Sequence, residues 1–399
     1  MKTSFLPGGS HGRSVAITGL GVVATAGIGK DAFFQGLSRP APEGTRIVTE
    51  FDPTPWFGPK DVRRVDRFAQ MGVAAAEMAL DDAGRPEVDP DRAGVIIGTG
   101  VGGLTTLEEQ ILVHHEKGPR RVSPFLVPMM MGNAAAGNVS IRNGWRGPCE
   151  TTVTACAAGT HSVGNAARLV ATGRCDVVLA GGAEAAATPV AMAGFGNMTA
   201  LSNSGISRPF DSARDGFVMA EGAGVLLMED LDRAIARGAH IYAIVAGAAS
   251  NADAHHITAP SPGGAGAAAC MELALEDAGI DPSEVRHINA HGTSTPLNDA
   301  AEAEAINKVF GTPGPAVTST KGVTGHALGA AGAIEAVTLA LTIDRAFIPP
   351  TAGHEHPDPD IHLDLVVGEP RSWEPGPALS NSFGFGGHNG TLVFIPHRG

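Results

Sequence analysis

The chain has 399 residues, of which 43% are hydrophobic and 17% charged, a balance typical of a compact globular protein with a large core. Its formal net charge of −13 argues against a nucleic-acid-binding protein, which needs a basic surface to neutralise phosphates, and against a polybasic membrane-binding surface. The sequence shows neither the apolar stretch of a signal peptide nor an uninterrupted apolar run long enough to span a membrane, so we expect a cytoplasmic protein.

Strands and helices are expected to alternate along most of the chain. After residues 1–13, which we predict to be a flexible tail, strands are predicted at 15–25, 94–100, 151–155, 176–182, 224–230, 241–250, 287–290, 316–319 and 391–396. Helices are predicted at 61–83, 156–172, 231–237, 264–278, 299–309 and 326–343. This alternation indicates an α/β protein with layered sheets and helices between and outside them. No internal repeat is evident in the sequence.

The four cysteines are Cys149, Cys156, Cys175 and Cys270, and none forms a CxxC pair. The spacing therefore favours neither a metal site nor a disulfide scaffold, and we expect reduced thiols.

Cys156 is the strongest nucleophile candidate. The β-branched run Thr151–Thr154 stops just before it, and small residues with helical spacing follow it. A cysteine at such a strand-to-helix corner meets the free N–H groups of the helix start, which would lower the pKa of its thiol. The alternative is that Cys156 is one more buried small side chain, as free cysteines usually are.

Two histidines occupy comparable positions. His291 follows a short strand in NAHGTSTPLND, and His326 follows Gly325 in STKGVTGHALGAAGAIE. Lys321 and Glu335 lie in the same apolar stretch as His326, and two charges buried there would need to pair. A cysteine with two distant histidines fits nucleophilic catalysis but does not select the reaction.

Taken together, five motifs resemble the β-ketoacyl-ACP synthase family, most closely its synthase II branch. They are TACAAG around Cys156, RPFDSARDGFVMAEGAG (208–224), NAHGTSTPLND (289–299), STKGVTGHALGAAGAIE (319–335) and NSFGFGGHNG (381–390). The resemblance implies a thiolase-like fold of five αβαβα layers, with one half at 14–250 that contains the cysteine and a similar half at 251–399 that contains the histidines.

The resemblance also implies a reaction, fatty-acid elongation by decarboxylative condensation of an acyl thioester with malonyl-ACP. In it, Cys156 carries the acyl group, His291 and His326 act on malonyl-ACP, and Phe385 gates the site and shares an oxyanion hole with the Cys156 backbone. Thr293 and Thr295 would contact the phosphopantetheine arm, which the carrier protein supplies in place of a cofactor. The acyl pocket would include Val101, and the carrier protein would dock on Lys60, Arg63, Arg64 and Arg67.

Three alternatives remain. A non-catalytic chain-length factor would lack the cysteine, and a thiolase would have a second cysteine near the C-terminal end, where this chain has none after Cys270. A ketosynthase subunit of a discrete polyketide system, paired with a chain-length factor rather than forming the homodimer usual in the family, stays open. Ala157, Ala158, Leu297, Asn298 and His388 depart from common family residues and leave the acyl-chain preference undetermined.

Overall fold

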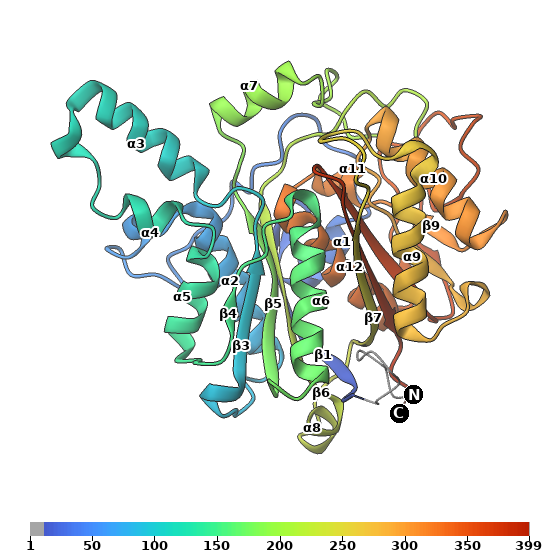
Figure 1. Ribbon diagram of the computed structural model, residues 1–399, viewed down its shortest axis with the longest axis horizontal. Coiled ribbons are helices and arrows are strands. Elements are labelled where there is room, and N and C mark those ends of the chain that lie inside the picture. Colours follow the sequence, from blue (N-terminus) through green and yellow to red (C-terminus); the bar gives the residue numbers. More distant parts are fainter. Residues whose placement is uncertain (1–11, 399) are drawn as a thin grey trace.

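The computed structural model describes residues 12–398, so almost all of the predicted tail, residues 1–13, lies outside the described residues (Figure 1). Most of the strands belong to one twisted 12-stranded sheet, in the order β11-β9-β8-β13-β14-β7-β1-β6-β5-β3-β4, with β2 paired to β1. Along this order, strands of the first part of the chain lie on one side and strands of the second part lie on the other.

The two sides repeat one topology. The first set is β4 (Cys149–Glu150), β3 (Ala93–Gly98), β5 (Val177–Glu184), β6 (Gly222–Asp230) and β1 (Val15–Ala24). The second is β9 (Ala316–Thr318), β8 (His287–Asn289), β13 (Ala378–Gly384), β14 (His388–Ile395) and β7 (Ala243–Ala252). In each set the first two pairings are parallel and the next two antiparallel. The implied fold of two similar halves is therefore confirmed, although the repeat was not visible in the sequence.

Helices complete the five layers. Helices α6 (Ala158–Ala171) and α12 (Ala331–Arg345) lie between the two sets of strands and contact both. The outer face of the first set is covered by α2 (Arg67–Asp82) and α5 (Ala134–Asn143), and that of the second by α9 (Ala265–Ala278), with α10 (Pro296–Phe310) beside it. The remaining elements are α1 (Lys30–Gly36), α3 (Leu104–Lys117), α4 (Leu126–Met130), α7 (Pro189–Asn197), α8 (Leu231–Ala236), α11 (Lys321–Thr324), β2 (Gly27–Ile28), β10 (Phe347–Ile348), β11 (Asp364–Leu365) and β12 (Arg371–Ser372).

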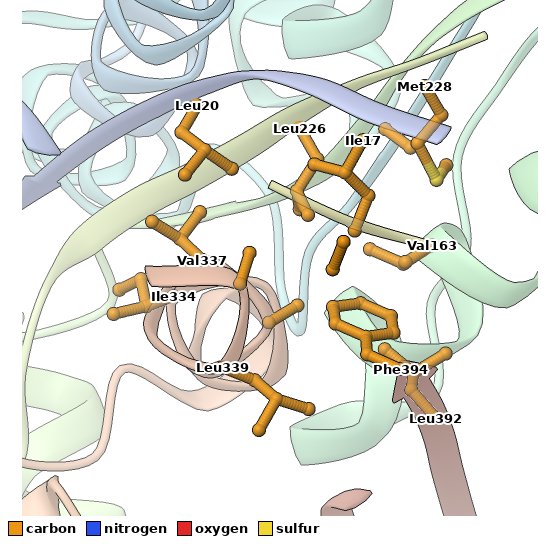
Figure 2. Packing of buried hydrophobic residues seen from close by; sticks show 14 of the residues in the cluster. Ile17, Leu20, Val163, Leu226, Met228, Ile334, Val337, Leu339, Leu392 and Phe394 are labelled. Atoms are coloured by element: carbon orange, nitrogen blue, oxygen red, sulfur yellow. The ribbon is translucent and has the colours of Figure 1, made fainter. Parts of the chain in front are cut away.

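The core lies around the middle layer. Figure 2 shows Val337 of α12 below Leu20 of β1, and Val163 of α6 with Phe394 of β14 below Ile17, all within one apolar cluster. The helices approach the strands so closely that a Cβ atom on Gly224 would lie 2.6 Å from the backbone nitrogen of Ile334. Close packing of layers explains why the sequence is rich in glycine and alanine.

Three predicted elements need correction. Helix α2 begins at Arg67, not near residue 61, because the Asp66 carboxylate accepts the Phe68 N–H at 3.1 Å and caps the helix there. No strand forms at 151–155, and the strand at this place, β4, is limited to Cys149–Glu150. The helix predicted from 326 begins at Ala331, because His326 is held beside Met219 in a β-bridge.

The predicted boundary between the halves at residues 250 and 251 remains a prediction, and β7 spans it. Among residues 12–398, no helix has both the length and the apolar character that crossing a membrane requires.

Candidate active site

Cys156 lies at a sharp corner between the β4 segment and helix α6. Ala155, just before it, has φ +49°, a left-handed conformation that costs energy for a residue with a Cβ atom. A single 3-10 turn, Ala155–Ala157, then leads into α6 at Ala158. The predicted corner is therefore present, and the surrounding structure must hold the turn in this strained conformation.

The thiol faces both predicted histidines across a cavity of about 560 Å³. The Cys156 sulfur and one nitrogen each of His291 and His326 lie within 4.8 Å of one another. The two imidazole rings stand almost perpendicular, at 84°, with their centroids 5.3 Å apart. His291 follows β8, and His326 lies between α11 and α12, so the second half of the chain brings both rings to the nucleophile of the first.

Both imidazoles are neutral at neutral pH. Burial lowers the pKa of His291 and of His326 well below the usual value near 6.5, and the positive charge of Lys321 lowers each further. A neutral imidazole has one N–H donor and one nitrogen lone pair, so each ring can donate a hydrogen bond to a carbonyl or accept a proton.

Lys321 and Glu335 form the predicted ion pair, completely buried beneath the histidines. The Lys321 ammonium also donates to the backbone carbonyl oxygen of His291 at 2.6 Å, and its Nζ lies 3.4 Å from Nδ1 of the same residue. Burial raises the pKa of Glu335 to about 7, although Lys321 opposes this shift. Because the Lys321 ammonium beside it is a donor, Nδ1 of His291 acts as the acceptor, and the N–H of the neutral ring is on Nε2.

The expectation of a lowered thiol pKa is wrong. Burial raises the pKa of Cys156 to about 11. The Phe385 and Cys156 backbone N–H groups and the charge of Lys321 lower this pKa, but their effect is smaller than that of burial. The resting residue is thus a protonated thiol, and it must lose its proton during the attack.

Phe385, Thr293 and Thr295 also line the cavity. The Phe385 backbone N–H is directed at the Cys156 sulfur, and its half-buried ring lies 6.4 Å from the ring of Phe195. The hydroxyl groups of Thr293 and Thr295 are hydrogen-bonded to each other at 2.9 Å. Sequence reasoning thus placed all three residues in the cavity that contains the thiol.

Other predicted site residues lie elsewhere. Val101 is 48% exposed and is not among the residues that line the cavity. Lys60, Arg63 and Arg64 are exposed. Arg67, by contrast, forms a two-pronged ion pair with Glu221, with contacts of 2.6 and 2.8 Å, so its charge is neutralised within the chain. This pairing separates Arg67 from the predicted carrier-protein patch.

Sequence reasoning missed two buried carboxylates behind His291. Glu302 accepts the backbone N–H groups of His291 and Gly292, both at 2.7 Å, and Asp299 accepts those of Phe210 and Ser294 at 2.8 and 3.2 Å. Their signal in the sequence is that Asp299 is the last residue of the histidine motif and Glu302 follows it by three residues on α10.

The chain matches two family models, "Beta-ketoacyl synthase, N-terminal domain" over residues 42–234 and "Beta-ketoacyl synthase, C-terminal domain" over residues 242–355. A 3-oxoacyl-[acyl-carrier-protein] synthase 2 from Synechocystis sp. is 45% identical over 410 residues, covering 97% of this chain and 99% of that protein.

Solved structures show the same fold. The ishigamide ketosynthase/chain length factor is 34% identical with a TM-score of 0.91, covering 97% of this chain and 100% of that one. A type II polyketide ketosynthase, bound to a hexaketide and in complex with its acyl-carrier protein, is 34% identical with a TM-score of 0.89 and the same coverage.

Proposed function

The chain belongs to the β-ketoacyl synthase family, and we propose that Cys156, His291 and His326 perform its condensation reaction. The enzyme is a β-ketoacyl-ACP synthase, which joins an acyl group to a malonyl unit in fatty-acid elongation. The observation that supports the assignment of residues is the convergence of one thiol and two neutral imidazoles on one cavity.

In the first step the Cys156 sulfur attacks the thioester carbonyl of acyl-ACP. Because the thiol is protonated at rest, a neutral imidazole within 4.8 Å takes its proton as the new S–C bond forms. The bond to the pantetheine sulfur then breaks, and the carrier thiol leaves with that proton. The acyl group is now a thioester of Cys156.

In the second step malonyl-ACP loses carbon dioxide. The electron pair of the broken C–C bond passes into an enolate, whose oxygen accepts N–H hydrogen bonds from His291 and His326. Because the pKa of each ring is low, both rings stay neutral, and each neutral ring has one N–H that it can donate to the enolate oxygen. The enolate carbon attacks the acyl carbonyl and a C–C bond forms. The S–C bond to Cys156 then breaks, and the sulfur leaves as a thiolate that takes up a proton from solvent and returns to the resting thiol.

The tetrahedral oxyanion needs its own donors. The backbone N–H groups of Cys156 and Phe385 are both directed toward the sulfur, so an oxygen on the carbon bonded to that sulfur would lie within their reach. Thr293 and Thr295, which also line the cavity, would bind the polar phosphopantetheine arm. That arm comes with the carrier protein, and the proposed steps need no further cofactor.

The acidic carrier protein would dock on the exposed cations Lys60, Arg63 and Arg64. A local basic cluster allows an enzyme with a net charge of −13 to bind an acidic partner. The cytoplasm stays the proposed location.

A homodimer is the proposed assembly. Strand β4 forms an edge of the sheet, and nearby elements expose Ile111 of α3, Val127 of α4 and Val153 beyond β4, at 58%, 57% and 58%. Exposed apolar side chains beside a free strand edge are typical of an interface. A heterodimer with a chain-length factor, as in the ishigamide protein, is the alternative, and it would accompany a polyketide role.

Mass spectrometry after incubation with acyl-ACP tests the reaction. We expect the acyl mass on the peptide that contains Cys156 and on none of the peptides with Cys149, Cys175 or Cys270. Cys156→Ala should lose the adduct, and an adduct that persists on another cysteine would refute the assignment.

A further inference from the structure

A buried carboxylate outside the catalytic set lies close behind the nucleophile. Glu184, the last residue of β5, is 0% exposed and accepts hydrogen bonds from Gly100 N at 2.6 Å, Gly329 N at 3.0 Å and the Thr99 hydroxyl at 3.0 Å. Among the ion pairs found in residues 12–398, none includes Glu184. A buried acid without a cation, held by neutral donors, is costly and calls for a specific role.

The carboxylate joins two loops from different halves of the chain. Gly100 follows β3, and Gly329 lies in the turn before α12. A Cβ atom on Gly329 would lie 2.2 Å from Gly100 N, and one on Gly100 would lie 2.7 Å from a carboxylate oxygen of Glu184. The two loops therefore meet backbone to backbone, and Glu184 satisfies the N–H groups that this contact leaves without partners.

The turn held by Glu184 presents Leu328 to the active site. Leu328 is buried, lines the cavity and packs in one apolar cluster with Cys156, Phe217 and Met219. Its φ of +42° is unfavourable for a leucine, so the turn needs outside support to keep this shape. An acyl group attached to the Cys156 sulfur would therefore lie beside Leu328.

We propose that Glu184 is a positioning residue that sets the acyl-chain preference of the condensation by holding Leu328 beside Cys156. The proposal rests on the proposed function, because it assumes that Cys156 carries the acyl chain. A short acyl group needs little of the space beside the sulfur, whereas a longer one depends on Leu328 keeping the orientation that the turn gives it. Glu184 therefore affects the preference between long and short acyl chains more than the rates of the chemical steps.

Two substitutions separate the charge of Glu184 from its hydrogen bonds. In Glu184→Gln the amide oxygen still accepts both N–H groups, and its NH₂ can donate to the Thr99 hydroxyl, so the loops stay joined. Glu184→Ala removes all of these bonds. The matched control is Glu229→Ala, which removes a carboxylate that is also 0% exposed, on β6 opposite the start of β5, where it pairs with Arg237.

The measurement is the rate of Cys156 acylation by a short-chain and a long-chain acyl-ACP, followed by mass spectrometry, together with the melting temperature and malonyl-ACP decarboxylation. In Glu184→Ala we expect the long-to-short ratio of kcat/KM to fall about tenfold, the size of effect that a few lost methylene contacts produce. Decarboxylation should stay within about threefold of the wild-type rate, since the histidines are untouched. Glu184→Gln and Glu229→Ala should keep the wild-type ratio.

The proposal is overturned if Glu184→Ala keeps the wild-type ratio while it loses as much melting temperature as Glu229→Ala, because Glu184 would then be only structural. If Glu184→Ala does not fold, Glu184→Asp, whose carboxylate is one methylene shorter, replaces it under the same criteria. A wild-type enzyme that takes no acyl group on Cys156 would refute the proposed function instead, so the two failures are distinct.

Discussion

The ammonium of Lys321 lies 3.4 Å from Nδ1 of His291 and donates to the backbone carbonyl oxygen of the same residue. One buried cation therefore fixes the position of the ring and disfavours its protonation. The positive charge of Lys321, which lowers the pKa of both histidines, is paired with Glu335 of α12, a helix of the middle layer.

The pH dependence of decarboxylation should reflect this arrangement. Since burial and Lys321 hold the pKa of both histidines well below 6.5, the active neutral form persists as pH falls through 6.5. We expect malonyl-ACP decarboxylation to lose activity only well below that pH. Lys321→Ala should move the acid limb of the profile upward, because the repulsion between the ammonium and the protonated rings is removed.

The double variant Lys321→Ala/Glu335→Ala controls for the unpaired carboxylate. Its acid limb should coincide with that of the single variant, because burial keeps Glu335 protonated over this pH range once Lys321 is absent. A profile that is identical in all three enzymes would show that Lys321 does not govern the histidines.

Alkylation of Cys156 offers an independent measurement of its protonation. With a thiol pKa of about 11, the rate constant for iodoacetamide should rise about tenfold per pH unit from pH 7 to pH 10, because only the thiolate reacts. Peptide mapping must separate this reaction from that of the exposed Cys149. A plateau below pH 8 would instead indicate that the helix start stabilises the thiolate despite burial.

The elements and the catalytic set could be predicted from the sequence because each has a local signal. Many buried strands are apolar runs; His291 directly follows one of them, whereas Cys156 follows a β-branched run and His326 follows a glycine. Spacing alone could not show that the three side chains converge. Their convergence depends on the topology that the two halves share, and this similarity is not visible in the sequence. The resemblance supplied it instead.

The errors have physical causes. The helix dipole suggested an acidic thiol, but burial has the larger effect on Cys156. The position of Arg67 close to Arg63 and Arg64 suggested an exposed cation. Its side chain instead pairs with Glu221, which is more than 150 residues away in the sequence. Glu184 had no sequence signal of its own because its donors are backbone N–H groups from two distant loops.

The active site should also bind a soft divalent metal ion when no substrate is present. A thiol and two imidazoles whose ligand atoms lie within 4.8 Å of one another would form a three-ligand zinc site with one open position once the metal ion displaces the thiol proton. Micromolar Zn²⁺ should therefore inhibit acylation in competition with acyl-ACP, and a chelator should restore activity. Binding measured by calorimetry should be lost in Cys156→Ala, and undiminished binding in that variant would place the ion elsewhere.

The carrier-protein surface gives the last prediction, which depends on how Arg67 differs from its neighbours. Reversing the exposed charges in Lys60→Glu/Arg63→Glu/Arg64→Glu should raise KM for acyl-ACP at least about tenfold and leave the rate with acyl-pantetheine unchanged, since the latter lacks the acidic protein.

Arg67→Ala should behave differently, because it leaves Glu221, which is 4% exposed, without its cation. We expect this variant to lose about 3 kcal/mol of unfolding free energy, within the range found when one partner of a buried pair is removed, while its KM for acyl-ACP changes little. Denaturant titration and steady-state kinetics on the same preparations distinguish the two effects. If Arg67→Ala raised KM as much as the triple reversal without loss of stability, Arg67 would belong to the docking surface after all.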